Sequence, residues 1–115
     1  MTTHTLDVLI IGAGAAGARA AIEIEQQTDD VEQLVIGKQE HGDAHTTWAR
    51  GGINAALGNI DWQDTWQIHA ADTLKEGHFI CDPTAVENVT KQMPDRVKEL
   101  DDWGMDFTKT EDELI

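Results

Sequence analysis

The chain has 115 residues, and 22 Asp and Glu face only 8 Lys and Arg, which gives a net charge of −14 at pH 7. This balance argues against a nucleic-acid or anionic-membrane surface, because phosphate recognition needs clustered Lys and Arg. The hydrophobic content of 40% is typical of a folded domain, and one cysteine, Cys81, excludes an internal disulfide. Two interpretations of the acidity remain open. One is a surface adapted to high salt, which the even spread of the acids favours, and the other is an acidic face that meets a basic partner.

The N-terminal stretch carries the first strong pattern. Residues 6–11, Leu-Asp-Val-Leu-Ile-Ile, predict a strand buried on both faces of a parallel sheet. Residues 12–17 follow with G-x-G-x-x-G spacing, and helix-forming residues come next. In a dinucleotide-binding turn, Gly12 permits the tight turn, Gly14 admits the backbone close to a diphosphate, and Gly17 lets the helix pack on the strand. The context favours a dinucleotide site over its alternative, an Ala/Gly-rich helix start without a ligand.

A second strand is predicted at residues 31–36, which completes the start of a right-handed βαβ unit. Such units usually place an acid after this strand to hold a ribose hydroxyl. Here Gly37 and Lys38 occupy that place, and Glu40 is a poor substitute. The departure weakens a plain NAD interpretation more than a flavin one.

The most informative stretch is residues 44–52, Ala-His-Thr-Thr-Trp-Ala-Arg-Gly-Gly. A Gly-Gly pair marks a place where the backbone must come close to something flat or bulky. The stretch resembles the flavoprotein subunits of succinate dehydrogenase and fumarate reductase and their relative L-aspartate oxidase, whose pattern is Ser-His-Thr, a few small residues, and Gly-Gly. The resemblance continues through Asp72-Thr73, Gly77 and residues 82–104, and so covers nearly the whole chain.

In the complex-forming members of that family the histidine is bonded covalently to FAD, and His45 falls on its position. Covalent attachment, noncovalent FAD beside an unlinked His45, and a solvated loop histidine are the three alternatives. Two departures from the family pattern matter here. Ala44 replaces the usual serine, which removes a hydroxyl, and Arg50 replaces the usual Gln or Glu, which adds a cation beside the flavin.

Helices are predicted after this stretch. Residues 64–76 are expected to form one, capped by Asp61 or Asp64 and ended by Gly77. Its bulky residues are expected to be core positions rather than cofactor contacts, namely Trp62, Trp66, Ile68 and His69. His69 and His78 lack partners at metal-ligand spacing, so no metal is predicted.

Asp82 and Pro83 predict the start of a further helix, as cap and first helical residue. Its apolar stripe comprises Val86, Val89, Met93, Val97 and Leu100. Pro94 interrupts the stripe, which predicts two helices or a kinked one with Pro94 opening the second part. Gly104 is expected to end it, before a strand-like region at 105–115.

The fold class expected is α/β, the N-terminal part of a Rossmann-like FAD-binding domain with a βαβ unit, additional helices and an incomplete sheet whose edge is open and apolar. Residues 1–104 are assigned to that domain, and residues 105–115 to the start of a connection to a missing capping domain. The resemblance implies that the groups that grip the dicarboxylate and move its proton lie downstream, so no catalytic residue is predicted within this chain.

The function expected from the resemblance is hydride exchange at flavin N5 with a dicarboxylate of the succinate or fumarate type. An L-aspartate oxidase of NAD biosynthesis is the alternative. Cys81-Asp82-Pro83 leans toward the oxidase, whereas His45 and Asn54-Ala55-Ala56 lean toward the dehydrogenase. A catalytically incomplete fragment that only binds a dinucleotide is the third interpretation.

The resemblance further implies a dicarboxylate substrate for the intact enzyme and an iron–sulfur partner subunit. Neither nucleic-acid binding nor direct membrane insertion is expected, and the location expected is cytoplasmic, with peripheral attachment to the inner face of the membrane through partner subunits as an extension. The cofactor expected is FAD. Its predicted binding residues are Gly12, Ala13, Gly14, Ala15, Ala16, Gly17, Ile36, Gly37, Lys38, Ala44, His45, Thr46, Thr47, Ala49, Gly51 and Gly52.

Overall fold

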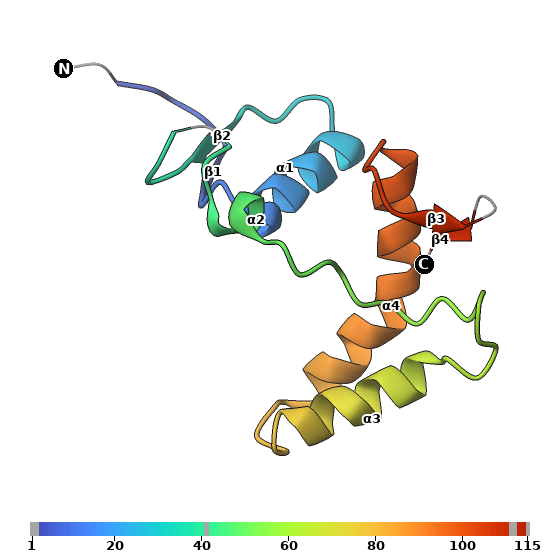
Figure 1. Ribbon diagram of the computed structural model, residues 1–115. Coiled ribbons are helices and arrows are strands. Elements are labelled where there is room, and N and C mark those ends of the chain that lie inside the picture. Colours follow the sequence, from blue (N-terminus) through green and yellow to red (C-terminus); the bar gives the residue numbers. More distant parts are fainter. Residues whose placement is uncertain (1–2, 41, 111–112, 115) are drawn as a thin grey trace. The chain divides into compact units, whose positions relative to one another are not determined.

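The computed structural model describes residues 3–40, 42–110 and 113–114 of the chain (Figure 1). The chain forms two compact units, Met1–Gly52 and Ile53–Ile115, which are called here the N-terminal unit and the C-terminal unit. Each unit has its own secondary structure, and each is described by itself. Across the described residues, no helix is long and apolar enough to cross a membrane.

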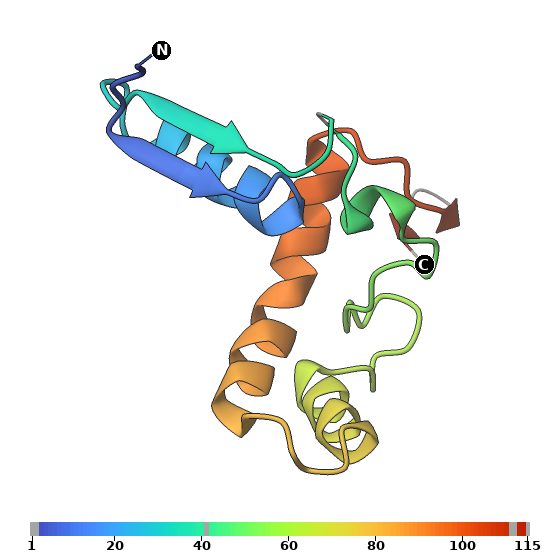
Figure 2. The same ribbon diagram turned by 90° about the vertical axis from the view of Figure 1, so that its left-hand side faces the viewer.

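The N-terminal unit is a βαβ arrangement. Strand β1 (Val8–Ile11) is followed by helix α1 (Ala15–Gln27) and strand β2 (Gln33–Ile36). The two strands pair in parallel, with Val8 opposite Gln33 and Ile11 opposite Ile36. Helix α1 lies along one face of this pair (Figure 2). The predicted strand, glycine turn, helix and strand are confirmed, although both strands begin two residues later than predicted.

The two faces of the small sheet differ in burial. Val8 and Ile10 point toward α1 and are half-buried, and the Gln33 amide donates to the carbonyl of Ala21 in that helix at 3.1 Å. Leu9 and Ile11 alternate with them and remain 48% and 81% exposed. The prediction of a strand buried on both faces is therefore wrong for the described structure. A helix covers one face of this apolar strand, and its other face is exposed.

A short helix that the sequence did not predict follows β2. Helix α2 (His45–Trp48) begins after Ala44, whose backbone is extended. The Thr47 hydroxyl accepts the Ala44 N–H at 3.2 Å and donates to the Ala44 carbonyl at 2.7 Å. A Thr hydroxyl bonded to the start of its own turn stabilises a single helical turn of this kind.

The C-terminal unit is built on two helices. Helix α3 (Trp66–Glu76) packs on helix α4 (Pro83–Asp102), and two short strands, β3 (Lys109–Thr110) and β4 (Glu113–Leu114), pair in antiparallel fashion (Figure 1). The helices and the strand-like region agree in order with the prediction. The segment before α3 joins this packing through Ala56, which is buried.

The caps of α3 and α4 correct one expectation and confirm another. At α3 the cap is Thr65, whose hydroxyl accepts the Ile68 N–H at 3.4 Å, so the prediction of Asp61 or Asp64 is wrong. The Asp61 carboxylate instead accepts the Gln63 N–H at 2.9 Å and shapes the loop before the helix. At α4 the predicted cap is confirmed, because the Asp82 carboxylate accepts from Thr84 at 2.9 Å and from Ala85 at 3.3 Å.

Helix α4 is a single helix that continues through Pro94, so the first of the two predicted alternatives, two separate helices, is wrong. Packing of its buried side against α3 compensates for the one backbone hydrogen bond that a proline cannot donate. The buried positions are Thr90 at 2% and Val97 at 5% exposure, whereas Val89 of the predicted stripe is 58% exposed. The side facing α3 therefore runs along Val86, Thr90, Met93 and Val97. The buried Thr90 hydroxyl donates a hydrogen bond to the Val86 carbonyl at 2.9 Å.

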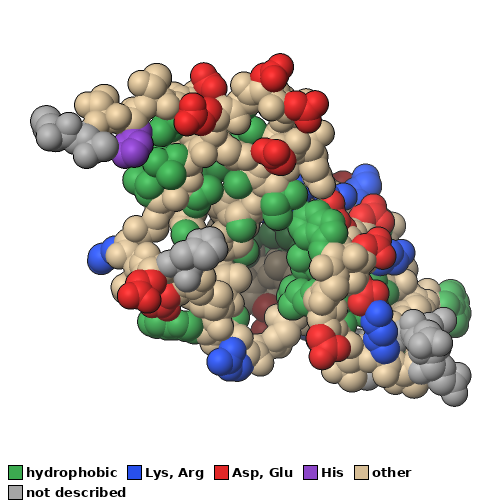
Figure 3. All heavy atoms as spheres, turned by 90° about the horizontal axis from the view of Figure 1, so that it is seen from above, with side chains coloured by type: hydrophobic (Ala, Val, Ile, Leu, Met, Phe, Trp, Pro, Cys, Tyr) green, Lys and Arg blue, Asp and Glu red, His purple; other side chains and the backbone are tan. Residues whose placement is uncertain are grey.

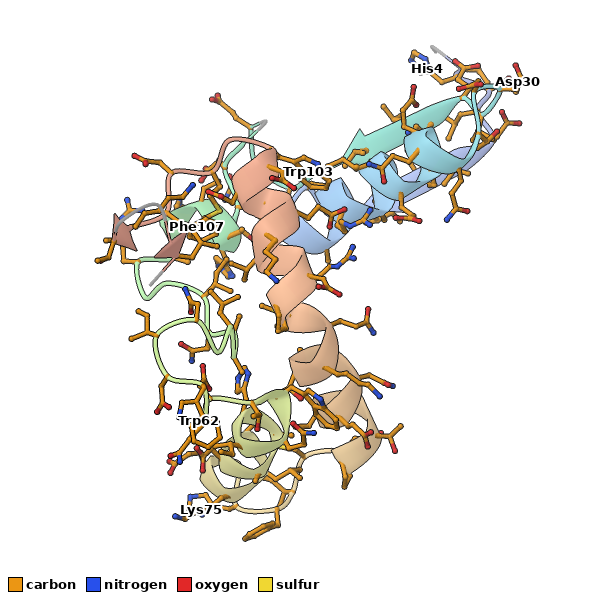
Figure 4. The ribbon with its side chains drawn as sticks, turned by 90° about the vertical axis from the view of Figure 1, so that its right-hand side faces the viewer. His4, Asp30, Trp62, Lys75, Trp103 and Phe107 are labelled. Atoms are coloured by element: carbon orange, nitrogen blue, oxygen red, sulfur yellow. The ribbon has the colours of Figure 1, made fainter. Side chains whose placement is uncertain are left out.

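Both helices end where the glycines predict. Gly77 is the C-cap of α3, and His78 after it takes the left-handed conformation with φ 51°. Helix α4 ends before Gly104, where φ is 93°, and the Met105 N–H bonds back to the Leu100 carbonyl at 3.0 Å. Trp62, by contrast, lies in the loop before α3 (Figure 4) and is 81% exposed, so its prediction as a core residue is wrong.

Candidate functional site

Three segments of the N-terminal unit converge at the end of the sheet: the turn at 12–17, the end of β2, and helix α2. The Gly12 N–H donates to the Ile36 carbonyl at 2.8 Å, which ties the turn to β2. The Ala15 N–H donates to the Thr46 hydroxyl at 3.1 Å, which ties it to α2. The fold therefore gathers most of the predicted site residues in one place, at the carboxyl ends of two parallel strands.

The glycine turn has the geometry that its motif predicts. Gly12 has φ 125°, a conformation that side chains rarely adopt, and it carries the chain out of β1. At Gly17 there is no room for a side chain, because a Cβ atom would lie 1.8 Å from the Gly12 carbonyl oxygen and 3.3 Å from Ile10 Cγ2. Helix α1 can thus start directly above the strand only with glycine at both positions.

The N-terminus of α1 is suited to an anion. Its N-cap is Gly14, which offers no side-chain cap, and the first turn holds no acidic residue. The first backbone N–H groups of a helix have no partner within the helix, and the helix dipole adds positive potential there. The Ala15 N–H is taken by Thr46. Within the described residues, the N–H groups of Ala16 and Gly17 have no protein acceptor outside α1, so they can serve phosphate oxygens.

A hollow of about 460 Å³ lies beside the turn, against α1 and the end of β2. Gly37 forms part of it, and a Cβ at that position would lie 3.0 Å from Ala13 Cβ, so small residues are needed on both sides. The lining is mostly small and apolar, which suits a flat apolar group next to a diphosphate. The lining residues are Ala13, Ala18, Ala21, Ile22, Val35, Gly37 and Gln39.

His45 is the first residue of α2 and is exposed. Its ring centroid lies 5.8 Å from that of Trp48, with the planes tilted by 51°. Within the described residues, its ring nitrogens have no protein hydrogen-bond partner. An accessible imidazole nitrogen can act as a nucleophile, and this is the property that attachment to a flavin requires.

The segment after α2 begins with hydrogen bonds from Arg50 and continues into two glycines with open space around them. The Arg50 guanidinium donates to the Thr47 and Ala49 carbonyls, both at 3.3 Å, and so satisfies the end of the short helix. Gly51 and Gly52 follow, and a Cβ at either position would meet no atom within 4 Å. The structure thus brings residues 44–47 to the turn, whereas Lys38, Ala49, Gly51 and Gly52 are exposed and make no described contact with it.

Helix α2 and its contact with the turn are what the sequence reasoning missed. A Ser or Thr at the N-cap is the usual sign of a helix start, and Ala44 lacks that hydroxyl. The remaining signal was Thr47, three residues later, which supplies the reciprocal bond to the Ala44 N–H. Among the described residues, no group of three or more His, Cys, Asp or Glu side chains could hold a metal ion.

Comparison with known proteins adds the family. A family described as FAD binding domain matches residues 7–114, which is nearly the whole chain. The match includes both units and every predicted site residue. The α1 amides of Ala16 and Gly17 and the apolar hollow beside Gly37 fit the diphosphate and adenosine of such a cofactor.

Curated relatives agree with that match. The succinate dehydrogenase flavoprotein subunit of Rickettsia bellii (strain RML369-C) is 38% identical over 112 residues, which cover 97% of this chain and 18% of the relative. The mitochondrial succinate dehydrogenase [ubiquinone] flavoprotein subunit of Oryza sativa subsp. japonica is also 38% identical over 112 residues, covering 97% and 17%. One subunit of the fumarate reductase (CoM/CoB) of Methanothermobacter marburgensis is 37% identical over 113 residues, covering 97% and 20%. The chain therefore spans about a fifth of the length of the curated relatives it matches.

Proposed function

This chain belongs to the FAD-binding domain family, and on that premise we propose that it supplies the dinucleotide-binding part of a flavin enzyme that exchanges hydride with succinate or fumarate. Relatives named for succinate dehydrogenase and fumarate reductase support the substrate class. The observation that carries the proposal is the convergence of the glycine turn, the end of β2 and the His45 segment at one end of the sheet. The cofactor identified by the family is FAD.

The proposed roles follow the three segments. The turn at 12–17 binds the diphosphate, residues 36–38 lie near the adenosine, and residues 44–52 lie along the isoalloxazine. The open α1 amides support the first role, and the hollow beside Gly37 supports the second. The exposed backbone at Gly51 and Gly52 supports the third, because a flat ring can approach it without meeting a side chain.

The second part of the proposal is a covalent bond between FAD and His45. The exposed ring and its place on α2, next to the glycine turn, support it. The purified protein, produced at its natural length, is denatured with acid and centrifuged. A yellow, fluorescent pellet supports the bond, colour in the supernatant alone shows noncovalent FAD, and a colourless protein contradicts FAD binding.

A pair of histidine variants locates the bond. His45→Ser should move all flavin from the pellet to the supernatant. His4→Ser is the matched control, because His4 is exposed and precedes β1 at the end of the sheet remote from the turn (Figure 4). Flavin that stays in the pellet of H45S would show attachment elsewhere.

The reaction is tested by turnover of the protein at its natural length. We expect succinate to reduce a dye acceptor through the enzyme, and fumarate to be reduced when a low-potential donor is supplied. Oxidation of L-aspartate with no activity toward succinate would contradict the dicarboxylate proposal and place the protein with the amino-acid oxidases. FAD binding without turnover of any of these compounds would leave only the dinucleotide-binding role.

We further propose that the 115 residues are the N-terminal part of a longer flavoprotein. Residues 1–104 would belong to its FAD-binding domain, and 105–115 would begin the connection to a capping domain. The short share of each relative that the chain covers supports a longer protein, and the word "subunit" in their names supports assembly with partner subunits, of which we propose that one carries iron–sulfur centres. We also propose a cytoplasmic location with peripheral attachment to the membrane through such partners. Mass spectrometry of the natural protein and of what copurifies with it tests both points.

The acidity supports a surface adapted to high salt. Acidic residues occur along the whole sequence, Figure 3 shows acidic side chains at several places on the surface, and both units contribute to a net charge of −14. Dense carboxylates repel one another in dilute buffer, and molar salt screens that repulsion. The melting temperature should therefore rise when KCl is raised from dilute buffer to molar concentration. An unchanged melting temperature would favour a basic partner as the reason for the charge.

A further inference from the structure

We infer that Thr46 is a positioning residue, which holds helix α2 against the glycine turn. It thereby fixes the distance between His45, the proposed attachment point of the flavin, and the turn that is proposed to bind the diphosphate. This inference rests on the proposed function for its consequence, but the contact itself belongs to the chain alone. Thr46 Oγ1 accepts the N–H of Ala15, the first residue of α1, at 3.1 Å across 31 positions of sequence. Within the described residues, it is the hydrogen bond that joins residues 44–50 to the turn.

The Thr46 hydroxyl also lies close to Gly14 of the glycine turn. A Cβ atom at Gly14 would lie 3.4 Å from Thr46 Oγ1 and 3.9 Å from Ala44 Cβ. These distances are ordinary van der Waals contacts, so α2 lies directly beside the glycine turn at this position.

Helix α2 transmits this contact to His45. The Thr47 hydroxyl closes the turn on Ala44 through both its N–H and its carbonyl, and Arg50 bonds the carbonyls at its far end. We expect the residues of a helical turn that is hydrogen-bonded at both ends to move together. Because His45 and Thr46 are neighbours in that piece, a bond from Thr46 to Ala15 restrains where the His45 ring can lie.

The consequence for FAD is geometric. Its diphosphate lies in the middle of the molecule and is joined to the isoalloxazine through the ribityl chain, so a histidine can attack the ring only when both groups are held at a compatible separation. A Thr hydroxyl has one donor and two acceptor sites, so accepting from Ala15 leaves its own proton available to a phosphate oxygen. The link and a ligand contact can then coexist.

The experiment compares Thr46→Val, Thr46→Ser and wild type in the protein of natural length. Thr46→Val removes the acceptor and Thr46→Ser keeps it. In flavin-free protein, the Ala15 amide should exchange its hydrogen about tenfold faster in T46V than in wild type, and T46S should restore the slow rate. With FAD added, T46V should form covalent flavin more slowly, and its FAD dissociation constant should rise about tenfold.

Thr65→Val is the matched control, because Thr65 also accepts a backbone N–H at a helix start, in the C-terminal unit. It should leave Ala15 exchange and FAD binding at wild-type values. Equal Ala15 exchange in T46V and wild type would overturn the inference whether or not the protein binds flavin. A wild type that binds no FAD would overturn the proposed function, and the exchange comparison would still decide the role of Thr46. Loss of FAD binding in T46V that T46S fails to rescue, with unchanged Ala15 exchange, would assign Thr46 to another role.

Discussion

The N-terminal and C-terminal units differ in what holds their residues in place. In the C-terminal unit, Ala56, Thr90 and Val97 are buried among two packed helices. In the N-terminal unit, helix α1 has no buried residue, and one sheet face leaves Ile11 81% exposed. The site residues lie in the N-terminal unit, whose side chains are less buried, so their geometry depends on close backbone approach and on single hydrogen bonds. The C-terminal unit depends on apolar burial.

This difference predicts which substitutions matter in each unit. A change that crowds the backbone should be severe in the N-terminal unit, although no large side chain is lost. A change that removes buried methyl groups should be severe in the C-terminal unit, although no cofactor contact is lost.

Gly17→Ala should have the largest effect. The new Cβ would lie 1.8 Å from the Gly12 carbonyl oxygen, which is backbone and cannot rotate away, so α1 must shift off the strand. We expect a loss of about 3 kcal/mol in the free energy of unfolding, at the upper end of costs for overpacking, and loss of FAD binding. Urea titration and flavin absorbance measure the two effects.

Gly51→Ala is the control for stability in the same unit. Its added Cβ would meet no atom within 4 Å, and its φ is not in the left-handed range. Its free energy of unfolding should stay within about 0.5 kcal/mol of wild type. Equal losses in G17A and G51A would contradict the view that close helix–strand approach organises the N-terminal unit.

Val97→Ala should rank second. Val97 is 5% exposed in the core of the C-terminal unit, and truncation removes two buried methyl groups and leaves a cavity. We expect a loss of about 2 kcal/mol. Val89→Ala, at a position 58% exposed on the same helix, should cost less than about 0.5 kcal/mol. Both variants should keep the wild-type ratio of FAD to protein once folded, and a lower ratio in V97A alone would show that the core of one unit controls the site of the other.

The same contrast explains what could be predicted from the sequence. The glycine turn was predictable because each glycine answers to a local requirement, a positive φ at Gly12 and missing space at Gly17. The helix at Asp82-Pro83 was predictable because a cap and a proline act within one turn. The exposure of Leu9 and Ile11 was not predictable, because the sequence of an apolar strand does not indicate which element covers each of its faces.

The site could be predicted in part for the same reason. The motif residues and His45 were identifiable from spacing and from a family resemblance. Helix α2 was not, because Ala44 lacks the hydroxyl that marks a helix start. The bond from Ala15 to Thr46 joins residues 31 positions apart, and contacts at that range depend on how the chain folds. The Thr65 cap was missed because Asp61 and Asp64 offered equally good local chemistry nearby.

Asp82→Ala should have an intermediate effect on the C-terminal unit. The carboxylate accepts two N–H groups at the start of α4, at 2.9 Å from Thr84 and 3.3 Å from Ala85. We expect a loss of about 1 kcal/mol in the free energy of unfolding by urea titration. Asp95→Ala, at an exposed position inside the same helix, should be neutral, because alanine is the better helix former there. If D95A costs as much as D82A, the loss in D82A does not come from the cap.

The smallest effect is expected at the ion pair that ties β3 to the end of α4. Lys109 Nζ lies 2.7 Å and 2.8 Å from the two Asp101 carboxylate oxygens, and the side chains are 41% and 24% exposed. An exposed pair of this kind contributes about 0.5 kcal/mol or less. Lys109→Met removes the attraction alone, whereas Asp101→Asn also removes a negative charge from the negative end of the helix dipole. K109M should therefore be slightly the less stable of the two in urea titration at low salt. The difference between them should disappear in molar KCl, and a difference that persists there would show that packing of the Lys109 stem, not charge, holds β3 to the helix.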